Sequence, residues 1–219
     1  MALPADLSLQ ELRVALAPAV ADAAVFDGWT DLAVRNGAEL EGADPEVASF
    51  AFRGGAMAMI AAWIAHVDLA MASALPPQEL AALKIRERIR RLVQFRLDAI
   101  AGQREALRRA LAIMAMPQNV PEALRLGWQS ADAMWRLAGD TATDYNHYTK
   151  RMTLGALYTT TLAVYAQDES EGQADTRAFL ERRIEDVMRF EKLKGQLLRP
   201  GEDRFSIARF LGRLRYPAR

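Results

Sequence analysis

The 219-residue sequence contains no cysteine and only two histidines, His66 and His147. Without cysteine, neither disulfide bonds nor thiolate chemistry can operate, and a reducing cytosol is the simplest setting. Neither histidine has a glutamate three positions before it, so the paired Glu-x-x-His motifs of a four-helix di-iron site are missing. A Gly-x-Ser-x-Gly motif is missing, and Arg-Gly-Gly at residues 53–55 lacks the lysine and spacing of a phosphate loop. We therefore predict a binding protein rather than an enzyme, with no cofactor and no metal.

Strand patterns and targeting signals are missing as well. Valine, isoleucine and threonine never form alternating runs between turns, whereas alanine, leucine and methionine dominate the apolar composition, so we predict an all-α fold. The first ten residues show no basic region followed by an apolar core, so neither a secretory signal nor an organellar transit peptide is expected. The apolar run at 56–75 carries His66 and Asp68 at its middle, and a buried helix explains it better than a membrane span.

Turn residues divide the chain into a series of helices and three regions. Asp44 with Pro45 predicts a capped helix start, because aspartate favours the N-cap and proline the first helical position. The expected regions are a helix-turn-helix-like head at 1–75, a helical lipid-binding and dimerisation domain at 76–199, and a linker with an amphipathic helix at 200–219. The expected helices cover residues 9–24, 30–38, 45–52, 56–75, 78–102, 104–115, 121–138, 144–166 and 174–194, followed by a short one after 200.

The three short helices of the head resemble those of tetracycline-repressor-like transcription regulators, which makes a ligand-responsive repressor the alternative function. The charge of this region opposes DNA binding. Residues 1–75 contain three basic and ten acidic side chains, and the expected recognition helix at 44–52 has two acids and no base. Because DNA affinity depends on cations that neutralise phosphates, we predict that the fold is kept and that nucleic acid is not a partner.

Charged clusters in the body have a structural explanation. In the basic segment at 84–96, apolar residues recur at helical spacing, which predicts one buried stripe and one solvated face. The acids of 181–186 alternate with arginines and predict a salt-bridged outer face. Asp144 precedes His147 by three positions and is better explained as a helix cap than as half of a metal site. His66 is expected at the core or a helix edge.

The C-terminal segment predicts an interfacial helix. Its apolar residues follow an i, i+3, i+4, i+7 pattern, with arginines on another face, as in helices that lie on anionic membranes. A helix docked on its own domain is the alternative, since the two share this pattern. The expected membrane-binding residues are Phe205, Ile207, Arg209, Phe210, Leu211, Arg213 and Leu214.

An aromatic block joins two of the expected helices at residues 134–148. Trp135, Tyr145 and Tyr148 fall near one helix junction, where they are either core residues or an exposed surface for a partner. For the wall of a ligand cavity we name Tyr158, Leu162 and Phe179, although ordinary packing explains each of them equally well.

These residues resemble the ubiquinone-biosynthesis accessory proteins called the ninth coenzyme Q protein family. The resemblance runs through residues 26–57, 130–170 and 179–188, so its segments are spread over most of the length of the chain. It implies a tetracycline-repressor-like fold in a non-catalytic homodimer that binds isoprenoid lipids. It also implies a peripheral position on the inner face of a bacterial inner membrane, and the presentation of quinone precursors to a di-iron hydroxylase. The ligand is expected to be an isoprenoid or a phospholipid.

The family pattern places a hydroxylase-binding patch at the aromatic block. By matching position the resemblance implies Met134, Asp144, Tyr145 and Tyr148, to which the local cluster adds Trp135. One departure affects this patch. His147 stands where the family has tryptophan, and Lys150 replaces an arginine, which predicts an altered contact or a different partner.

Overall fold

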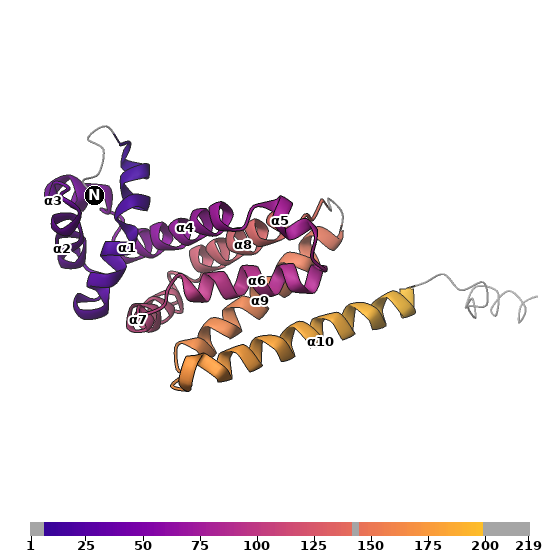
Figure 1. The fold of residues 1–219 in the computed structure, drawn as a ribbon. Coiled ribbons are helices and arrows are strands. Elements are labelled where there is room, and N and C mark those ends of the chain that lie inside the picture. The colour runs from indigo at the N-terminus through magenta and orange to yellow at the C-terminus, as the bar shows by residue number, and fades with distance from the viewer. Residues whose placement is uncertain (1–6, 142–144, 199–219) are drawn as a thin grey trace, which may run out of the picture. The chain divides into compact units, whose positions relative to one another are not determined.

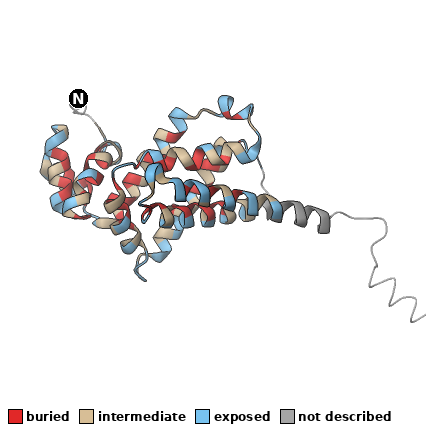
Figure 2. Ribbon diagram, turned by 60° about the horizontal axis from the view of Figure 1, so that its bottom comes forward, coloured by how far each residue is buried: buried red, intermediate tan, exposed pale blue. Residues whose placement is uncertain are grey.

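The computed structural model describes residues 7–141 and 145–198, and in these residues the ordered elements are helices (Figure 1). The prediction of an all-α fold is confirmed. Buried residues gather where the helices face one another, as Figure 2 shows. The elements are α1 (Leu9–Asp27), α2 (Asp31–Glu41), α3 (Pro45–Ala51), α4 (Ala56–Ala74), α5 (Pro77–Ala81), α6 (Ile85–Asp98), α7 (Arg104–Met114), α8 (Val120–Leu137), α9 (Tyr145–Tyr165), the short 3-10 helix η1 (Glu171–Gln173) and α10 (Ala174–Leu198).

The head begins with local capping interactions. Ser8 and Glu11 form a reciprocal capping box at the start of α1. At α3 the predicted cap is confirmed, because Asp44 accepts hydrogen bonds from the backbone N–H groups of Glu46 and Val47, with Pro45 as the first helical residue. Helices α1, α2 and α3 pack on one another, and α1 also packs on α4 and α7.

The contact between α1 and α2 depends on Gly37. A Cβ atom added there would lie 2.9 Å from the backbone nitrogen of Val20 and 3.0 Å from the backbone carbon of Ala19. Since backbone cannot move aside as a flexible side chain can, we expect Gly37→Ala to lower the free energy of unfolding by about 1–3 kcal/mol, measured by urea denaturation.

Gly127 provides the matched control for this substitution. It lies inside α8, and a Cβ atom there would meet nothing within 4 Å. Gly127→Ala should therefore raise the free energy of unfolding by up to about 1 kcal/mol, because alanine is the better helix former. Equal stability of Gly37→Ala and the wild type would contradict the close approach of α1 and α2.

By length and composition, helix α4 is long and apolar enough to cross a membrane. In the protein, 39% of its apolar stretch is buried. It packs against α1, α6, α7 and α8. Its side chains Met59, Ile60, Trp63 and Met71 are buried in these contacts. These contacts fit the predicted buried helix.

The single helix predicted at 78–102 is wrong. The chain breaks between α5 and α6, and Arg88 stabilises the break. Its guanidinium donates hydrogen bonds to the backbone carbonyls of Ala81, Leu83 and Ala138 at 2.7–2.9 Å. Carbonyl groups left free by the helix end are thus satisfied by one side chain. Helical periodicity alone could not reveal this contact, because Ala138 lies 50 residues further along the chain.

The connection from α9 to α10 is organised by Asp168. Its carboxylate accepts hydrogen bonds from the backbone and hydroxyl groups of Ser170 and Thr176, at 2.5–2.9 Å. Burial raises the pKa of Asp168, but these hydrogen bonds lower it more strongly, so its pKa lies well below the usual range.

Packing divides the chain into two units, residues 1–184 and 185–219, with the boundary inside α10. Head and body therefore share the first unit, and our division into three regions stays a prediction. Residues 200–219, which carry the predicted terminal helix and all seven predicted membrane-binding residues, lie outside the described part of the chain.

Candidate functional site

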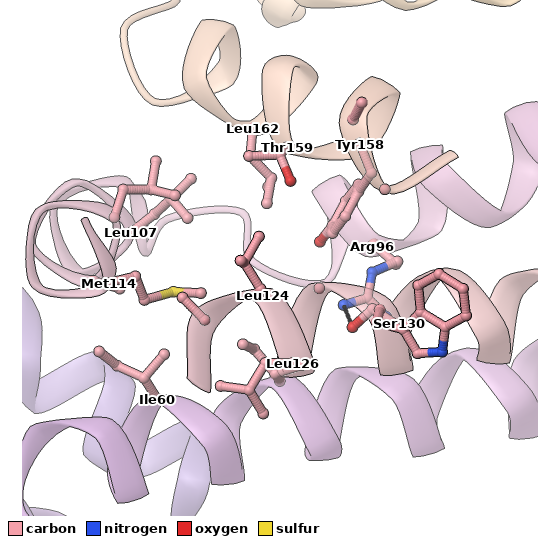
Figure 3. Close-up of a pocket in the computed structure, with 18 of the residues that line it drawn as sticks. Ile60, Arg96, Leu107, Met114, Leu124, Leu126, Ser130, Tyr158, Thr159 and Leu162 are labelled. Carbon is pink, nitrogen blue, oxygen red and sulfur yellow. Dashed lines mark hydrogen bonds between the residues drawn. The ribbon is translucent and has the colours of Figure 1, made fainter. Parts of the chain in front are cut away.

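A cavity of about 680 Å³ lies among α4, α6, α7, α8 and α9. Its wall is mostly apolar, with Ile60 on α4, Leu107 and Met114 on α7, Leu126 on α8 and Leu162 on α9 (Figure 3). Volume and lining are those of a site for a small apolar ligand. A hydrocarbon chain suits these walls, because it needs no hydrogen bonds.

The cavity opens to the surface beside α8 and α9. Two of its lining residues, Leu124 and Met152, have exposed fractions of 69% and 66%. Exposed apolar side chains at the rim of an apolar cavity give a hydrocarbon ligand a continuous path from outside.

One part of the wall carries a buried charge. The guanidinium of Arg96, on α6, forms an ion pair with Asp68 of α4 and donates a hydrogen bond to the hydroxyl of Ser130 at 3.1 Å. The Tyr158 ring packs against the guanidinium, with its centroid 4.7 Å from the guanidinium carbon. Burial opposes the charge of Arg96, but Tyr158 and Asp68 outweigh that effect and raise its pKa. Arg96 is thus a permanent cation in an apolar wall.

Arg96 was not predicted. The pattern of 84–96 placed the arginines on a solvated face, and Ile89, Leu92 and Val93 are buried as that pattern requires. Arg96 has an exposed fraction of only 1%. The available signal was Asp68, an acid in the middle of an apolar helix, which requires a cation when buried.

Two of the three predicted lipid-binding residues line the cavity, Tyr158 and Leu162. Phe179 is not among the lining residues. It lies on α10, where the guanidinium of Arg183 is 5.4 Å from the centre of its ring.

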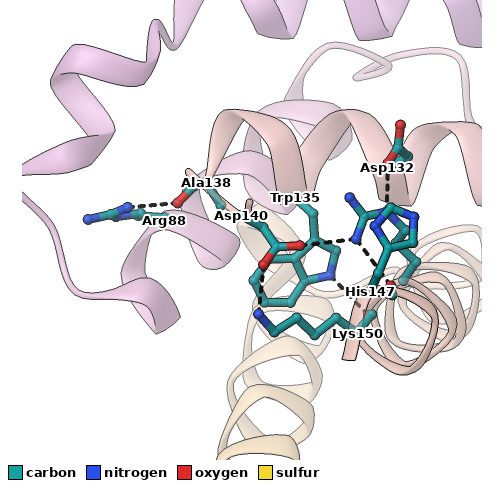
Figure 4. Close-up of polar contacts among 8 residues, drawn as sticks. Arg88, Asp132, Trp135, Ala138, Asp140, His147 and Lys150 are labelled. Atoms are coloured by element: carbon teal, nitrogen blue, oxygen red, sulfur yellow. Dashed lines mark hydrogen bonds and ion pairs between the residues drawn. The ribbon is translucent and has the colours of Figure 1, made fainter. Parts of the chain in front are cut away.

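At the junction of α8 and α9, a second buried arginine, Arg151, pairs with two acids, Asp132 and Asp140, which are labelled in Figure 4. Arg151 donates to Asp132 at 2.6 Å, to Asp140 at 3.0 Å and to the backbone carbonyl of His147 at 3.1 Å. Lys150 also pairs with Asp140, at 2.6 Å. These contacts fix the start of α9 against the end of α8.

The aromatic residues of this junction fall into two groups. The indole N–H of Trp135 donates to the backbone carbonyl of Lys150 at 2.9 Å, so this ring is tied to the junction. Trp128, His147 and Tyr148 form a separate cluster, which we call the aromatic cluster, with ring centroids 5.2–6.3 Å apart. Trp128 also lines the cavity, which links the cluster to it.

The residues of the predicted partner patch differ in how far they are exposed. Tyr148 has an exposed fraction of 58% and is available to a partner. Met134 is fully buried on the inner face of α8, so it has no surface to offer, and its predicted direct contact is corrected. Asp144 lies outside the described residues, as does the side chain of Tyr145, and with them the predicted cap before His147.

The other charged or titratable residues considered in the sequence analysis make contacts that hold helices together. His66 is half-buried, with Nδ1 3.2 Å from the backbone carbonyl oxygen of Val14, in agreement with the expected helix-edge position. On α10, Glu181 pairs with Arg90, and Glu185 with Arg189, as a salt-bridged face would. Within residues 7–141 and 145–198, no group of three acidic or histidine side chains is arranged to hold a metal ion.

Several known proteins are similar to this chain in sequence. The family model described as COQ9 matches residues 120–191, the region of α8, α9 and much of α10. The human ubiquinone biosynthesis protein COQ9, mitochondrial, is 34% identical over 182 residues, which is 80% of this chain. The predicted resemblance to the COQ9 family is confirmed. The corresponding COQ9 protein of Drosophila melanogaster is 26% identical over 201 residues.

The chain spans less than two thirds of these COQ9 relatives, 57% of the human protein and 61% of the Drosophila protein. Among solved structures, a TetR transcriptional regulator from Nitrosomonas europaea superposes with a TM-score of 0.63, covering 81% of this chain and 98% of the regulator. At 22% identity, that similarity establishes the regulator-like fold alone.

Proposed function

We propose that this protein is a non-catalytic lipid-binding accessory protein of ubiquinone biosynthesis. In this proposal the cavity takes up the isoprenoid tail of a quinone precursor, and the protein presents the precursor to a hydroxylase. The observation that carries the proposal is the apolar cavity of about 680 Å³ in a chain similar to COQ9 proteins. No covalent step is needed.

The driving force is the burial of hydrocarbon. Burying apolar surface is worth about 25 cal/mol per Å². A tail that leaves a bilayer for water loses this stabilisation, whereas a tail that enters the cavity between Leu107, Leu126 and Leu162 keeps it. The carrier therefore lowers the free-energy cost of moving a precursor out of the membrane.

Docking to the hydroxylase is assigned to the aromatic cluster. Tyr148 is exposed, and Trp128 connects the cluster to the cavity wall, so a partner bound there would lie close to the ligand. Exposed aromatic side chains are favoured anchors of protein interfaces. Trp135 contributes by fixing the junction through Lys150.

Membrane attachment is assigned to the segment at 200–219, which would hold a homodimer on the cytoplasmic face of a bacterial inner membrane. The COQ9 relatives are named as mitochondrial proteins. The repressor alternative is disfavoured by the head. Helix α3 spans only Pro45–Ala51 and carries an acid in its first turn, which repels phosphate.

Mass spectrometry of the purified protein tests the proposal. We expect protein isolated without detergent, or incubated with phosphatidylethanolamine and phosphatidylglycerol vesicles that contain a polyprenylated benzoquinone, to retain a lipid in a stoichiometric complex. The reason is the match between an apolar tail and the walls of the cavity. Protein that stays free of lipid under both conditions would overturn the carrier function.

A further inference from the structure

The guanidinium of Arg96 has a buried nitrogen, Nε, whose N–H lacks a partner in the described part of the chain. Its two terminal nitrogens are used by Asp68 and by the Ser130 hydroxyl. Buried polar groups in folded proteins are almost always paired, so an N–H without an acceptor in a cavity wall indicates the position of a ligand acceptor.

This donor is at one end of the cavity. In Figure 3, Arg96, Ser130 and Tyr158 lie together, and Ile60, Leu107 and Met114 lie at the other end. The cavity is therefore amphipathic along its length: one end suits a polar head group, and the other suits a hydrocarbon tail.

The charges of the side chains that line the cavity indicate whether a charged or a neutral head group would bind there. The positive charge of Arg96 is already neutralised by Asp68, and that of Arg151, the other lining arginine, by Asp132 and Asp140. An anionic head group would bring another negative charge beside these carboxylates, and among the described lining residues each arginine already has an acidic partner. A neutral acceptor meets the spare N–H without this penalty.

We propose that the Arg96 end of the cavity binds the neutral oxygen acceptor of an amphiphile, a carbonyl or phenolic oxygen, through the Nε–H of Arg96. The inference rests on the proposed lipid-binding function and adds the selectivity for head groups. Ser130 and Asp68 act as positioning residues, because they hold the two terminal nitrogens of the guanidinium. The face of the guanidinium is covered by Tyr158.

A ligand series on the full chain tests this assignment. Decane, 2-decanone and decanoate share a chain length and differ in the absence, neutrality or charge of the acceptor. Each competes with the neutral dye Nile red, whose fluorescence reports occupancy of the apolar cavity. Wild-type protein should bind 2-decanone more tightly than decanoate. Tighter binding of decanoate would overturn the preference for a neutral acceptor.

A double variant removes the donor together with its counter-ion. In Arg96→Met with Asp68→Leu, both charges are lost at once, which avoids an unpaired buried charge. We expect 2-decanone affinity to fall about tenfold, as for one hydrogen bond to a charged group, and decane affinity to stay within about twofold. The control is Arg86→Met, on the exposed side of α6, which should change neither. An equal loss for both ligands would contradict the role of the donor.

A measurement on wild-type protein keeps the test independent of folding in the variant. The infrared stretch of ¹³C-labelled 2-decanone should move to lower frequency in the complex than in alkane solvent, because the carbonyl accepts a hydrogen bond. A stretch at the alkane value would overturn the inference and leave the carrier function standing. Failure of all three ligands to displace Nile red would instead count against the cavity as a lipid site.

Discussion

We expect the Gly127→Phe variant to fold normally and to lose at least about tenfold in affinity for an apolar ligand. Gly127 lines the cavity on α8, and open space surrounds the position that its Cβ would occupy. A phenyl ring built from this open position extends into the cavity and fills space that the tail would use. Because apolar affinity follows the area buried, losing even part of the contact costs about 1.4 kcal/mol or more.

The measurement is the amount of polyprenylated quinone retained after incubation with vesicles, quantified by mass spectrometry. Gln129→Phe is the matched control, because it adds the same ring to an exposed position two residues further along α8. The control should retain as much lipid as the wild type. Equal retention by Gly127→Phe would mean that the lipid binds elsewhere, and the proposed function would lose its main support.

The fold was predictable because its signals are local. Helix starts such as Ser8 and Asp44 are fixed by groups two or three residues away, and amphipathic spacing identifies the helices between them. The break at residues 82–84 is stabilised by Arg88, which binds the nearby carbonyls of Ala81 and Leu83 and also the distant carbonyl of Ala138. Sequence periodicity carries no information about a carbonyl 50 residues away.

The cavity was only partly predictable for the same reason. Tyr158 and Leu162 lie on α9, a helix rich in tyrosine and threonine, and they line the cavity, but Phe179 on α10 is outside the lining. A cavity is defined by how separate helices pack, and the spacing along one helix does not set it. Arg96 was missed because a charge in a basic helix is ordinarily solvated, whereas here Asp68 on another helix accounts for its burial.

The partner surface shows a further limit of sequence reasoning. Met134 and Trp135 are adjacent in the sequence, yet their roles differ. Met134 is buried, and the indole N–H of Trp135 donates a hydrogen bond to the backbone carbonyl of Lys150. Lys150 pairs with Asp140, and its Nζ lies 5.4 Å from the centroid of the Trp135 ring. Its side chain therefore stabilises the junction. Of the described predicted contacts, Tyr148 is the most exposed.

The junction itself leads to the second prediction, in which Arg151→Met lowers the free energy of unfolding by about 3 kcal/mol or more. The Arg151 side chain is 2% exposed and joins Asp132 on α8 to Asp140 beyond its end. Its removal deprives two largely buried carboxylates of their most buried partner, and methionine cannot replace the charge. Breaking one side of a buried ion pair is costly because the remaining charge stays desolvated.

Arg136 offers a control that involves the same acid. It pairs with Asp132 at 2.8 Å, but its side chain is 74% exposed. Because water screens such a pair, Arg136→Met should cost less than about 1 kcal/mol in urea unfolding followed by circular dichroism. Similar losses in the two variants would show that burial does not decide the strength of the Arg151 contacts. A large loss for Arg151 alone would show that the stability of the α8–α9 junction, which carries the aromatic cluster, depends on a buried ion pair.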